Sequence, residues 1–319
     1  MSQTILFDGD HVEQLAEVTE RPRRLKESEL LWVDVDRESE RDVRRIAEAL
    51  EIDDRTRESL ARSPKRAVFH DHGRYIHVTT FAPNQHGGGE LIALECVVGR
   101  NWVVTAHDQP IPVLEEFAEG VSGSGDTGSL DGPTFLAALL EWVLGSYSTA
   151  FERIECRLEE FDVDAMRGDG DADSDIERLI AMRQEVGTLR RALAAHRSAL
   201  TALRHPELQA LNREASSERY ESLLTRFEST MQEARDAREG IVGSFDVLIA
   251  REGHRTNEIM KVLTLASVIL LPGALLSGVM GMNFEIGLFD TPSVFWVVVA
   301  VIVAVAPLVL TIAKRRQWI

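Results

Sequence analysis

Two long apolar segments without a charged residue, both near the C-terminal end, are the strongest constraint on how this chain folds. They run over residues 262–280 and 294–313. At about 1.5 Å per residue, a helix of either length nearly crosses a hydrocarbon layer about 30 Å thick. A buried helical hairpin in a soluble core is the alternative, but two such segments in tandem are hard to bury in a chain of 319 residues. The sequence therefore predicts two transmembrane helices.

The basic residues that flank these segments predict their orientation. Arg251, Arg255 and Lys261 precede the first segment, and the basic tail 314–319 follows the second. The connecting loop 281–293 contains no Lys or Arg. Because Lys and Arg next to a span are retained on the cytoplasmic side, we expect both termini in the cytoplasm and the short loop on the outer side of the cell membrane.

Composition excludes several classes of protein. Hydrophobic residues make up 44% of the chain, which is enough for a real core and excludes bulk disorder. The formal net charge of −17 repels phosphate backbones, so no nucleic-acid partner is expected. With Cys96 and Cys156 as the two cysteines, we expect neither a disulfide framework nor a cysteine zinc site, and we predict two buried thiols. The first residues lack the basic region of a signal peptide, so the N-terminal part should stay cytosolic.

Residues 1–125 alternate strand-like and helix-like patterns, which predicts a cytosolic α/β domain. An amphipathic helix is predicted at 38–52, and the Ser/Gly-rich segment 122–126 is typical of a linker. Short polar turns separate several apolar segments, which is typical of a meander of hairpins. The predicted strands lie at 30–35, 68–70, 75–79, 91–98 and 102–105.

From residue 126 onward the pattern becomes helical. Residues 126–212 predict an antiparallel helical hairpin, with helices at 133–167 and 176–205 on either side of the acidic loop 169–175. The candidate cap for the first of these helices is Asp131 or Gly132, with Pro133 in the first turn.

A single long helix is predicted next, because apolar residues recur every three or four positions from Tyr220 to Leu248 and no proline appears before Pro272. This stalk over 213–261 should continue unbroken into the first span. An isolated helix of that length needs neighbours to be stable, so an oligomer is expected. The predicted fold class is an α+β cytosolic domain followed by a long helical stalk and two transmembrane helices.

No sequence pattern supports an enzyme. The chain has no GxSxG, no HExxH, no P-loop and no GxGxxG after a strand. His70-Asp71-His72 could be a metal clip, but it lies at a predicted hairpin turn, where short polar residues are expected anyway. The DxDxD run beginning at Asp169 lacks the Gly and Glu that an EF-hand requires at positions six and twelve, and so predicts a solvated acidic loop. We therefore expect neither catalysis nor an organic cofactor.

The exit of the first span carries the most informative motif. Gly281-Met282-Asn283 follows the span directly, and Phe284-Glu285 continues it. The run Thr256 to Thr264 lies at the cytosolic end of the same span, and the basic tail contains Trp318. Together with the order of the predicted segments, these residues resemble the CorA family of divalent-cation channels over essentially the whole chain.

This resemblance implies a funnel-shaped homopentamer in the cell membrane that takes up Mg2+, and also Co2+, passively. The membrane potential would drive uptake, since one elementary charge gains about 2.3 kcal/mol per 100 mV. The resemblance also implies that cytosolic Mg2+ is a regulator as well as a substrate, bound between subunits with Asp246 as a ligand. Asp246 is predicted to lie on an otherwise apolar face of the stalk, where an unpaired carboxylate is costly unless a cation bridges it. Release of that ion would loosen the stalk and open the pore.

The composition of the loop agrees with this implication on physical grounds. Mg2+ sheds its water reluctantly, so a pore mouth should hydrogen-bond to the hydration shell of the ion. The carboxamide of Asn283 can accept those bonds without the deep trap of a carboxylate ring. Gly281 would permit the backbone conformation that aims Asn283, and Glu285 leaves the loop acidic. The predicted selectivity loop comprises Gly281, Met282, Asn283 and Glu285; the alternative is that Asn283 merely ends the helix.

If the stalk continues as the pore helix, helical spacing places a polar, then apolar, then polar path on one face. Met260, Leu263 and Leu271 would form a constriction that gates by dewetting, and Gly278 would let helices approach closely. The alternative for any single residue is ordinary packing between spans. The predicted pore-lining residues are Asn257, Met260, Leu263, Thr264, Leu271, Ala274 and Gly278.

Three departures from the family pattern bear on ion selectivity. Met280 stands where an aromatic residue usually precedes the Gly-Met-Asn, and Ala274 stands where a pore threonine is often found. Residues 286–290 replace an acidic, proline-containing stretch. A zinc transporter of the same superfamily is therefore the alternative function. A membrane-anchored helical sensor or scaffold is a more distant alternative.

Overall fold

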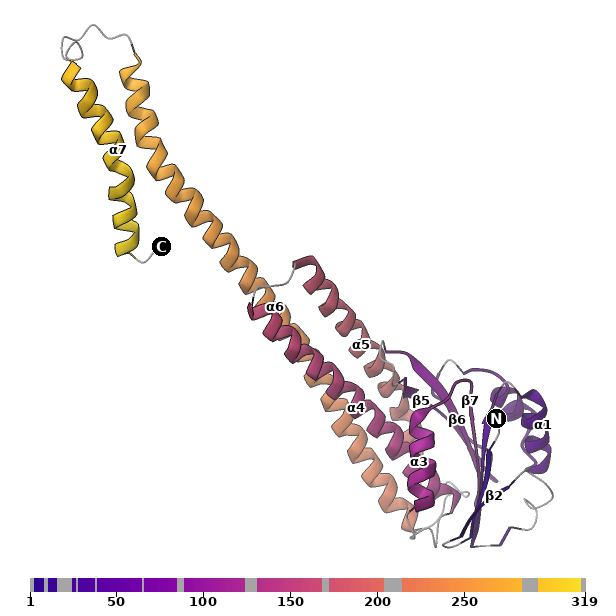
Figure 1. Cartoon of the computed structure of the whole chain (residues 1–319). Helices are drawn as coiled ribbons and strands as arrows, with labels where there is room; N and C mark the ends of the chain where they lie inside the picture. The colour runs from indigo at the N-terminus through magenta and orange to yellow at the C-terminus, as the bar shows by residue number, and fades with distance from the viewer. Residues whose placement is uncertain are drawn as a thin grey trace. The chain divides into compact units, whose positions relative to one another are not determined.

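An N-terminal α/β domain precedes four long helices, α4 to α7, in the computed structural model of the chain (Figure 1). The chain divides into two compact units, residues 1–245 and 246–319. The structure describes residues 3–8, 11–15, 25–26, 28–37, 39–64, 66–84, 89–123, 131–167, 172–203, 214–282 and 292–316.

A seven-stranded sheet forms the centre of the first unit, in the spatial order β2-β1-β3-β7-β6-β5-β4. Among the described strands, β3 and β7 are the parallel pair, and every other neighbouring pair is antiparallel. The strands are β1 (Gln3–Asp8), β2 (His11–Leu15), β3 (Glu29–Asp36), β4 (Phe69–Asp71), β5 (Ile76–Pro83), β6 (Leu91–Val98) and β7 (Trp102–His107).

The strands β4 to β7 confirm the predicted meander, since each pairs with the next along the chain. In the turn between β4 and β5, the backbone N–H of Gly73 donates to Oδ1 of Asp71 at 2.7 Å. Gly73 has a φ of +75°, which a side chain would strain. His70 and Asp71 end β4 and His72 opens the turn, so this run lies at a hairpin turn, as predicted. Within the described residues, no group of three or more His, Cys, Asp or Glu side chains is arranged to hold a metal ion.

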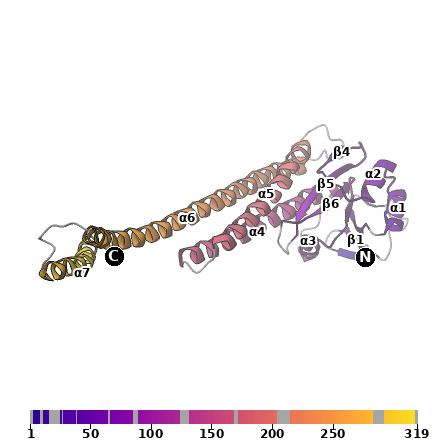
Figure 2. The same ribbon diagram turned by 90° about the horizontal axis from the view of Figure 1, so that it is seen from above.

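Helices cover both faces of this sheet (Figures 1 and 2). On one face, α1 (Glu40–Ala49) and α2 (Asp54–Leu60) bury Val43 and Leu60 against strand residues such as Val33. The helix predicted at 38–52 is observed as α1. On the other face lie α3 (Pro112–Gly123), α4 (Gly132–Arg167) and α5 (Ala172–Leu203). There the ring of Phe135 lies 5.2 Å from that of Trp32 and 5.0 Å from that of Phe117.

Two of the predicted loops are partly helical. The helix α3 extends through Ser122 and Gly123, where the composition predicts a linker. The helix α5 begins at Ala172, so Asp173 and Asp175 lie in its first turn instead of in a solvated loop, and Asp175 is buried. Acidic side chains stabilise the first turn of a helix through its dipole, which explains why α5 starts before its apolar pattern does. The rest of these two segments, 124–126 and 169–171, lies outside the described residues.

The long helices pack side by side in the first unit. The cap predicted for α4 is present, since Oδ1 of Asp131 accepts from the N–H of Thr134 at 3.0 Å. The helix α6 (Glu214–Met280) confirms the predicted unbroken helix and passes through Pro272; α7 (Pro292–Arg315) follows it. The Tyr220 hydroxyl donates to the Pro133 carbonyl at 2.8 Å, and the hydroxyl oxygens of Thr230 and Ser148 lie 3.4 Å apart. Because the later residue of α6 contacts the later residue of α4, the two helices run parallel.

The start of α4 gives a stability prediction. A Cβ on Gly132 would collide with the carbonyl oxygen of Gly99, whereas a Cβ on Gly145, in the same helix, would meet no atom within 4 Å. Gly132→Ala should lower the free energy of unfolding by about 1–3 kcal/mol. Gly145→Ala should raise it by about 0.5–1 kcal/mol, because alanine favours the helix. Urea unfolding of both variants checks the pair, and equal effects would contradict the close approach at Gly132.

The buried His196 gives a pH prediction. Its Nε2 accepts from the N–H of Phe81 at 3.0 Å, and burial lowers the pKa of His196 to about 4 from the ordinary 6.5. The unfolded chain therefore binds a proton below about pH 6.5, while the folded chain does so only below about pH 4. The free energy of unfolding should fall across this window by up to about 3 kcal/mol as the pH is lowered.

Thermal unfolding of the full-length protein in detergent, measured from pH 8 to pH 4, tests this dependence on His196. Other groups also titrate in this range, so the matched variant is His196→Gln, whose amide oxygen can still accept from Phe81. That variant should be less stable at pH 8 but should lose less stability on acidification. Parallel curves for the two proteins would mean that His196 does not contribute.

Candidate functional site

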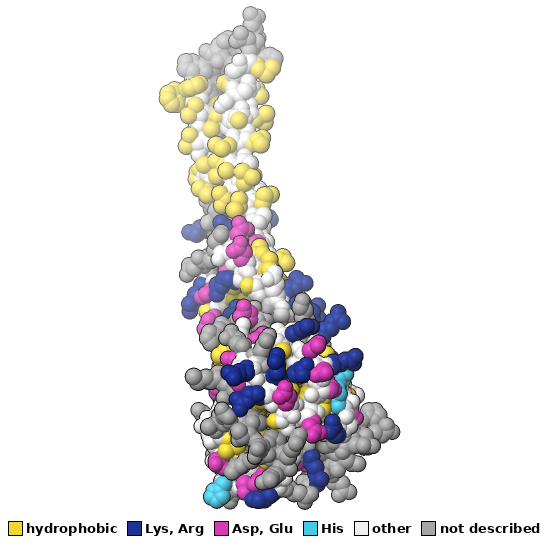
Figure 3. All heavy atoms as spheres, turned by 90° about the vertical axis from the view of Figure 1, so that its right-hand side faces the viewer, with side chains coloured by type: hydrophobic (Ala, Val, Ile, Leu, Met, Phe, Trp, Pro, Cys, Tyr) yellow, Lys and Arg dark blue, Asp and Glu magenta, His cyan; other side chains and the backbone are white. Residues whose placement is uncertain are grey.

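Among the residues that the structure describes, two helices are long and apolar enough to cross a membrane. They are the C-terminal part of α6 and the helix α7, whose most apolar windows have mean hydropathies of 2.2 and 2.8. These are the segments that the sequence predicts as spans. Figure 3 shows hydrophobic side chains gathered over this part of the chain, while Lys, Arg, Asp and Glu gather elsewhere.

In the second unit, α6 and α7 pack through one stripe of partly buried residues on each helix. A Cβ on Gly273 would lie 3.3 Å from Cγ2 of Ile302, so the α6 backbone approaches α7 closely at that position. The stripe on α6 comprises Leu265, Ile269, Pro272, Gly273, Leu276 and Met280. The stripe on α7 comprises Val298, Val299, Ile302, Val305, Ala306, Val309 and Ala313.

The predicted pore-lining residues lie on the opposite side of α6. Two positions along an α-helix are about 200° apart, so Leu271, Ala274 and Gly278 each point away from the α7-facing residue two positions earlier. All seven predicted residues are exposed: Asn257, Met260, Leu263, Thr264, Leu271, Ala274 and Gly278. The face is polar at Asn257 and Thr264 and apolar around Leu271. In the single chain, therefore, these residues do not pack between the two spans.

Half of the predicted selectivity loop lies in the described part of the chain. The N–H of Gly281 donates to the Ser277 carbonyl at 2.9 Å and that of Met282 to the Val279 carbonyl at 3.2 Å, so both residues close the end of α6. Gly281 does not have the left-handed backbone conformation that its role in aiming the loop suggests. The atoms that a Cβ there would meet are carbonyl oxygens of the preceding turn of the same helix, those of Ser277 and Gly278. Asn283 and Glu285 lie outside the described residues.

Asp246 is exposed in the single chain. The buried face of α6 in this region comprises Ile241, Ser244 and Leu248, and Asp246 points away from it. Its neighbours one turn away on the same face, Val242 and Ile249, are exposed apolar residues, so Asp246 lies on an otherwise apolar face of α6, as predicted. The spacing that suggested it cannot distinguish a face that packs within the chain from one that another subunit covers.

Of the two cysteines, Cys156 differs from its predicted burial. Cys96 is buried in β6, and burial raises the pKa of its thiol, as expected for an unreactive core cysteine. Cys156 is exposed on α4, although its helical surroundings predict burial. Both thiols are free.

A charged network inside the α/β domain is not predicted from the sequence. Glu95 of β6 is completely buried, and Arg37, which follows β3, is 5% exposed, with Nη2 of Arg37 3.3 Å from Oε2 of Glu95. Oε1 of Glu95 accepts from the Ser59 hydroxyl at 2.5 Å and lies 3.2 Å from Nε2 of His77. Arg37 also donates to the carbonyl oxygens of Arg62 and Ala106. Burial lowers the pKa of Arg37, and Glu95 opposes that effect.

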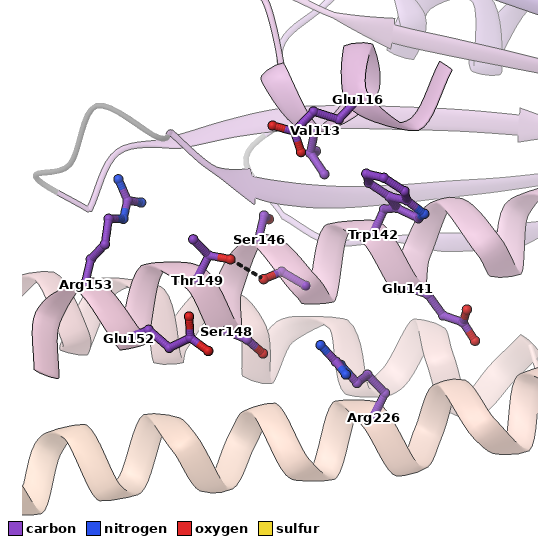
Figure 4. Close-up of a pocket in the computed structure, with 11 residues that line it drawn as sticks. Val113, Glu116, Glu141, Trp142, Ser146, Ser148, Thr149, Glu152, Arg153 and Arg226 are labelled. Atoms are coloured by element: carbon purple, nitrogen blue, oxygen red, sulfur yellow. Dashed lines mark hydrogen bonds between the residues drawn. The ribbon is translucent and has the colours of Figure 1, made fainter. Parts of the chain in front are cut away.

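A pocket of about 660 Å³ lies between α3, α4 and α6 (Figure 4). Carboxylates and guanidinium groups face it together, and the Thr149 hydroxyl already donates to the Gly145 carbonyl at 3.2 Å. This mixed lining favours no single class of ligand. The lining residues are Val113, Glu116, Glu141, Trp142, Gly145, Ser146, Ser148, Thr149, Glu152, Arg153 and Arg226.

Comparison with solved structures shows which fold these elements form. The chain superposes on the complete CorA magnesium transporter of Methanocaldococcus jannaschii with a TM-score of 0.82 at 20% identity, covering 99% of this chain and 98% of that one. It matches the full-length CmaX protein with a TM-score of 0.76 at 20% identity, covering 100% and 98%. It also matches the ZntB cytoplasmic domain of Vibrio parahaemolyticus with a TM-score of 0.63 at 14% identity, covering 79% and 98%.

Sequence comparison finds relatives that are named as cation-transport proteins. The chain is 27% identical over 183 residues to the cobalt/magnesium transport protein CorA of Methanocaldococcus jannaschii, which is 57% of this chain and 56% of that protein. It is 33% identical over 87 residues to the protein of the same name from Thermotoga maritima, which is 26% and 24% of the two chains. The match thus spans about half, or less, of these relatives. The family model described as CorA-like Mg2+ transporter protein matches residues 27–315. The chain therefore belongs to the CorA-like Mg2+ transporter protein family.

Proposed function

We propose that this chain forms a membrane channel for divalent cations, with Mg2+ as its main substrate and Co2+ as a further one. The observation that supports this function most directly is the exposed face of α6 that runs from Asn257 to Gly278 opposite the α7-packed stripe. Such a face, polar and then apolar, suits the wall of a pore that binds a cation weakly enough to release it. Uptake would be passive, and a divalent ion would gain about 4.6 kcal/mol per 100 mV of membrane potential, twice the value for one charge.

One α6–α7 pair cannot enclose a path, so the proposal requires several copies around an axis. Family membership supports a homopentamer, arranged as a funnel in the cell membrane with both chain termini in the cytoplasm. The α6 residues from Asn257 to Gly278 would then face the axis. Met260, Leu263 and Leu271 would form the constriction that gates the pore by dewetting.

The loop after α6 would select the ion at the outer mouth. Asn283 would accept hydrogen bonds from the water shell of the cation, and Glu285 would raise the local cation concentration. Gly281 and Met282 would hold the loop at the end of the helix through their hydrogen bonds to α6.

Cytosolic Mg2+ would regulate the channel through Asp246. An exposed carboxylate on each α6 gives a ring of like charges once the helices assemble around an axis. Bound cations would offset the repulsion of that ring and hold the stalks together. When cytosolic Mg2+ falls, the ring would loosen and the open state would gain population.

Two alternatives differ in what they predict. A zinc transporter of the same superfamily fits the same elements, and the fold match to the ZntB domain keeps it open. A membrane-anchored sensor or scaffold would carry no ion at all.

The deciding measurement is cation entry into proteoliposomes of the purified full-length protein under an imposed potential. Mg2+ entry that excess Co2+ blocks is the expected result. Zn2+ entry without Mg2+ entry would establish the zinc alternative, and no flux of any divalent ion would favour the scaffold.

A further inference from the structure

The first span contains a hydroxyl residue that the predicted pore-lining set omits. Ser267 lies on α6 and is exposed. It follows Leu265, which belongs to the α7-packed stripe, by two positions and is therefore about 200° away from it on the helix. Ser267 thus shares the face of Thr264, one turn earlier, and Leu271, one turn later. The other serine of the span, Ser277, lies about 100° away from Gly278 and so at the edge of this face.

The hydrogen bonds of these two hydroxyls fix what they can offer. The Ser267 hydroxyl donates to the Leu263 carbonyl at 2.9 Å, and the Thr264 hydroxyl donates to the Met260 carbonyl at 2.7 Å. A carbonyl oxygen can only accept, so each hydroxyl proton is committed to the backbone. What remains on the exposed side of each oxygen is a lone pair, which makes both side chains hydrogen-bond acceptors.

A hydrated divalent cation needs acceptors of this kind. The metal holds its water molecules through their oxygen atoms, so the hydrogens of the shell point outward and donate. We propose that Ser267, together with Thr264, forms a collar of hydroxyl acceptors that supports the water shell of the cation between the apolar side chains of Leu263 and Leu271. Ser267 would thereby set the rate of Mg2+ passage and the preference among divalent ions. This inference rests on the proposed function.

The competing explanation is that Ser267 is satisfied by its own helix and touches nothing else, as serine often does in a span. An isosteric pair of substitutions distinguishes the two. Ser267→Thr keeps the hydroxyl, whereas Ser267→Val replaces it by a methyl group in a side chain of nearly the same shape. Ser277→Val is the matched control in the same span.

Each variant is purified as the full chain, checked for the assembly state of the wild type, and measured for Mg2+ and Co2+ entry into proteoliposomes. Ser267→Val should reduce Mg2+ flux about three- to tenfold, the value of a neutral hydrogen bond, and should change the ratio of Mg2+ to Co2+ flux. Ser267→Thr and Ser277→Val should stay within about twofold of the wild type. Equal fluxes for the Val and Thr variants of Ser267 would overturn the inference and leave the channel function standing. Absence of flux in the wild type would overturn both.

A second measurement covers the case in which Ser267→Val fails to assemble. Ser267→Cys and Ser277→Cys are made in a Cys156→Ser background, because Cys156 is exposed and Cys96 is buried. A charged methanethiosulfonate reagent should react with the introduced thiol of the Ser267→Cys protein and block its Mg2+ flux, while the Ser277→Cys protein keeps its flux. Unaltered flux of a Ser267→Cys protein in excess reagent would overturn the collar.

Discussion

Replacing Asn283 by alanine is expected to reduce Mg2+ flux about 10- to 100-fold. In the proposed mouth of the pore, the Asn283 carboxamide accepts hydrogen bonds from water molecules that the cation polarises. A hydrogen bond to a charged partner contributes about 1.5–3 kcal/mol, and every 1.4 kcal/mol is a factor of ten in an equilibrium constant. The alanine side chain offers no acceptor at this position. The cation would then meet the mouth without a group that distinguishes its hydrated form.

The measurement combines growth and flux. Cells that lack magnesium uptake should grow at low Mg2+ with the wild-type chain and should fail to grow with Asn283→Ala at equal expression. Proteoliposome flux then gives the fold-change. Asn101→Ala, an amide-to-methyl change in the turn between β6 and β7, is the matched control and should behave as the wild type. Rescue by Asn283→Ala would contradict the selectivity role of this residue.

Local sequence patterns predict the elements whose signals are local. Apolar segments separated by short polar turns predict β5 to β7, and helical spacing predicts α1, α4 and the unbroken α6. The capping carboxylate of Asp131 is predicted because a cap acts within one turn. The two spans follow from length and absence of charge, which need no knowledge of the tertiary structure.

Elements held by distant contacts are missing from the prediction. The strand β1 carries the continuous run Ile5-Leu6-Phe7, because it is buried on both faces and so shows no alternation. Its pairing with β3 crosses more than twenty residues of sequence, and the parallel pairing of β3 with β7 crosses the whole meander. The helix α2 is a short segment rich in charged residues, and α3 ends in Ser122 and Gly123, which by composition resemble a linker.

For the candidate site, too, the sequence predicts what depends on local helix geometry and misses what depends on tertiary contacts. Helical spacing places the pore-lining residues on one face because geometry along a helix is local. Burial is not local, so Cys156, predicted to be buried, is exposed in the single chain. The sequence also gives no sign that Arg37, in a run of charged residues after β3, reaches the buried Glu95. Its partner lies in β6, and only the folded sheet brings the two together.

The buried ion pair of Arg37 and Glu95 gives the largest effect on stability that we expect. Arg37→Met should lower the free energy of unfolding by about 3–5 kcal/mol, because it leaves the Glu95 carboxylate buried without its cation. The contacts of Glu95 to Ser59 and His77 remain in this variant, but the ion pair with Arg37 is lost. The double variant Arg37→Met/Glu95→Leu should recover most of the loss, since a hydrophobic pair of similar volume removes both desolvation penalties.

Urea unfolding of the full-length protein in detergent, followed by near-UV circular dichroism, measures these differences. Arg74→Met is the matched control, because Arg74 contacts Glu51 at 2.9 Å and their side chains are 73% and 54% exposed. Solvent screens that pair, so its loss should cost no more than about 1 kcal/mol. If Arg37→Met cost as little as Arg74→Met, the buried pair would not stabilise the folded chain. If the double variant were as unstable as Arg37→Met, the loss would come from the contacts of Arg37 to the Arg62 and Ala106 carbonyls, not from the unpaired charge.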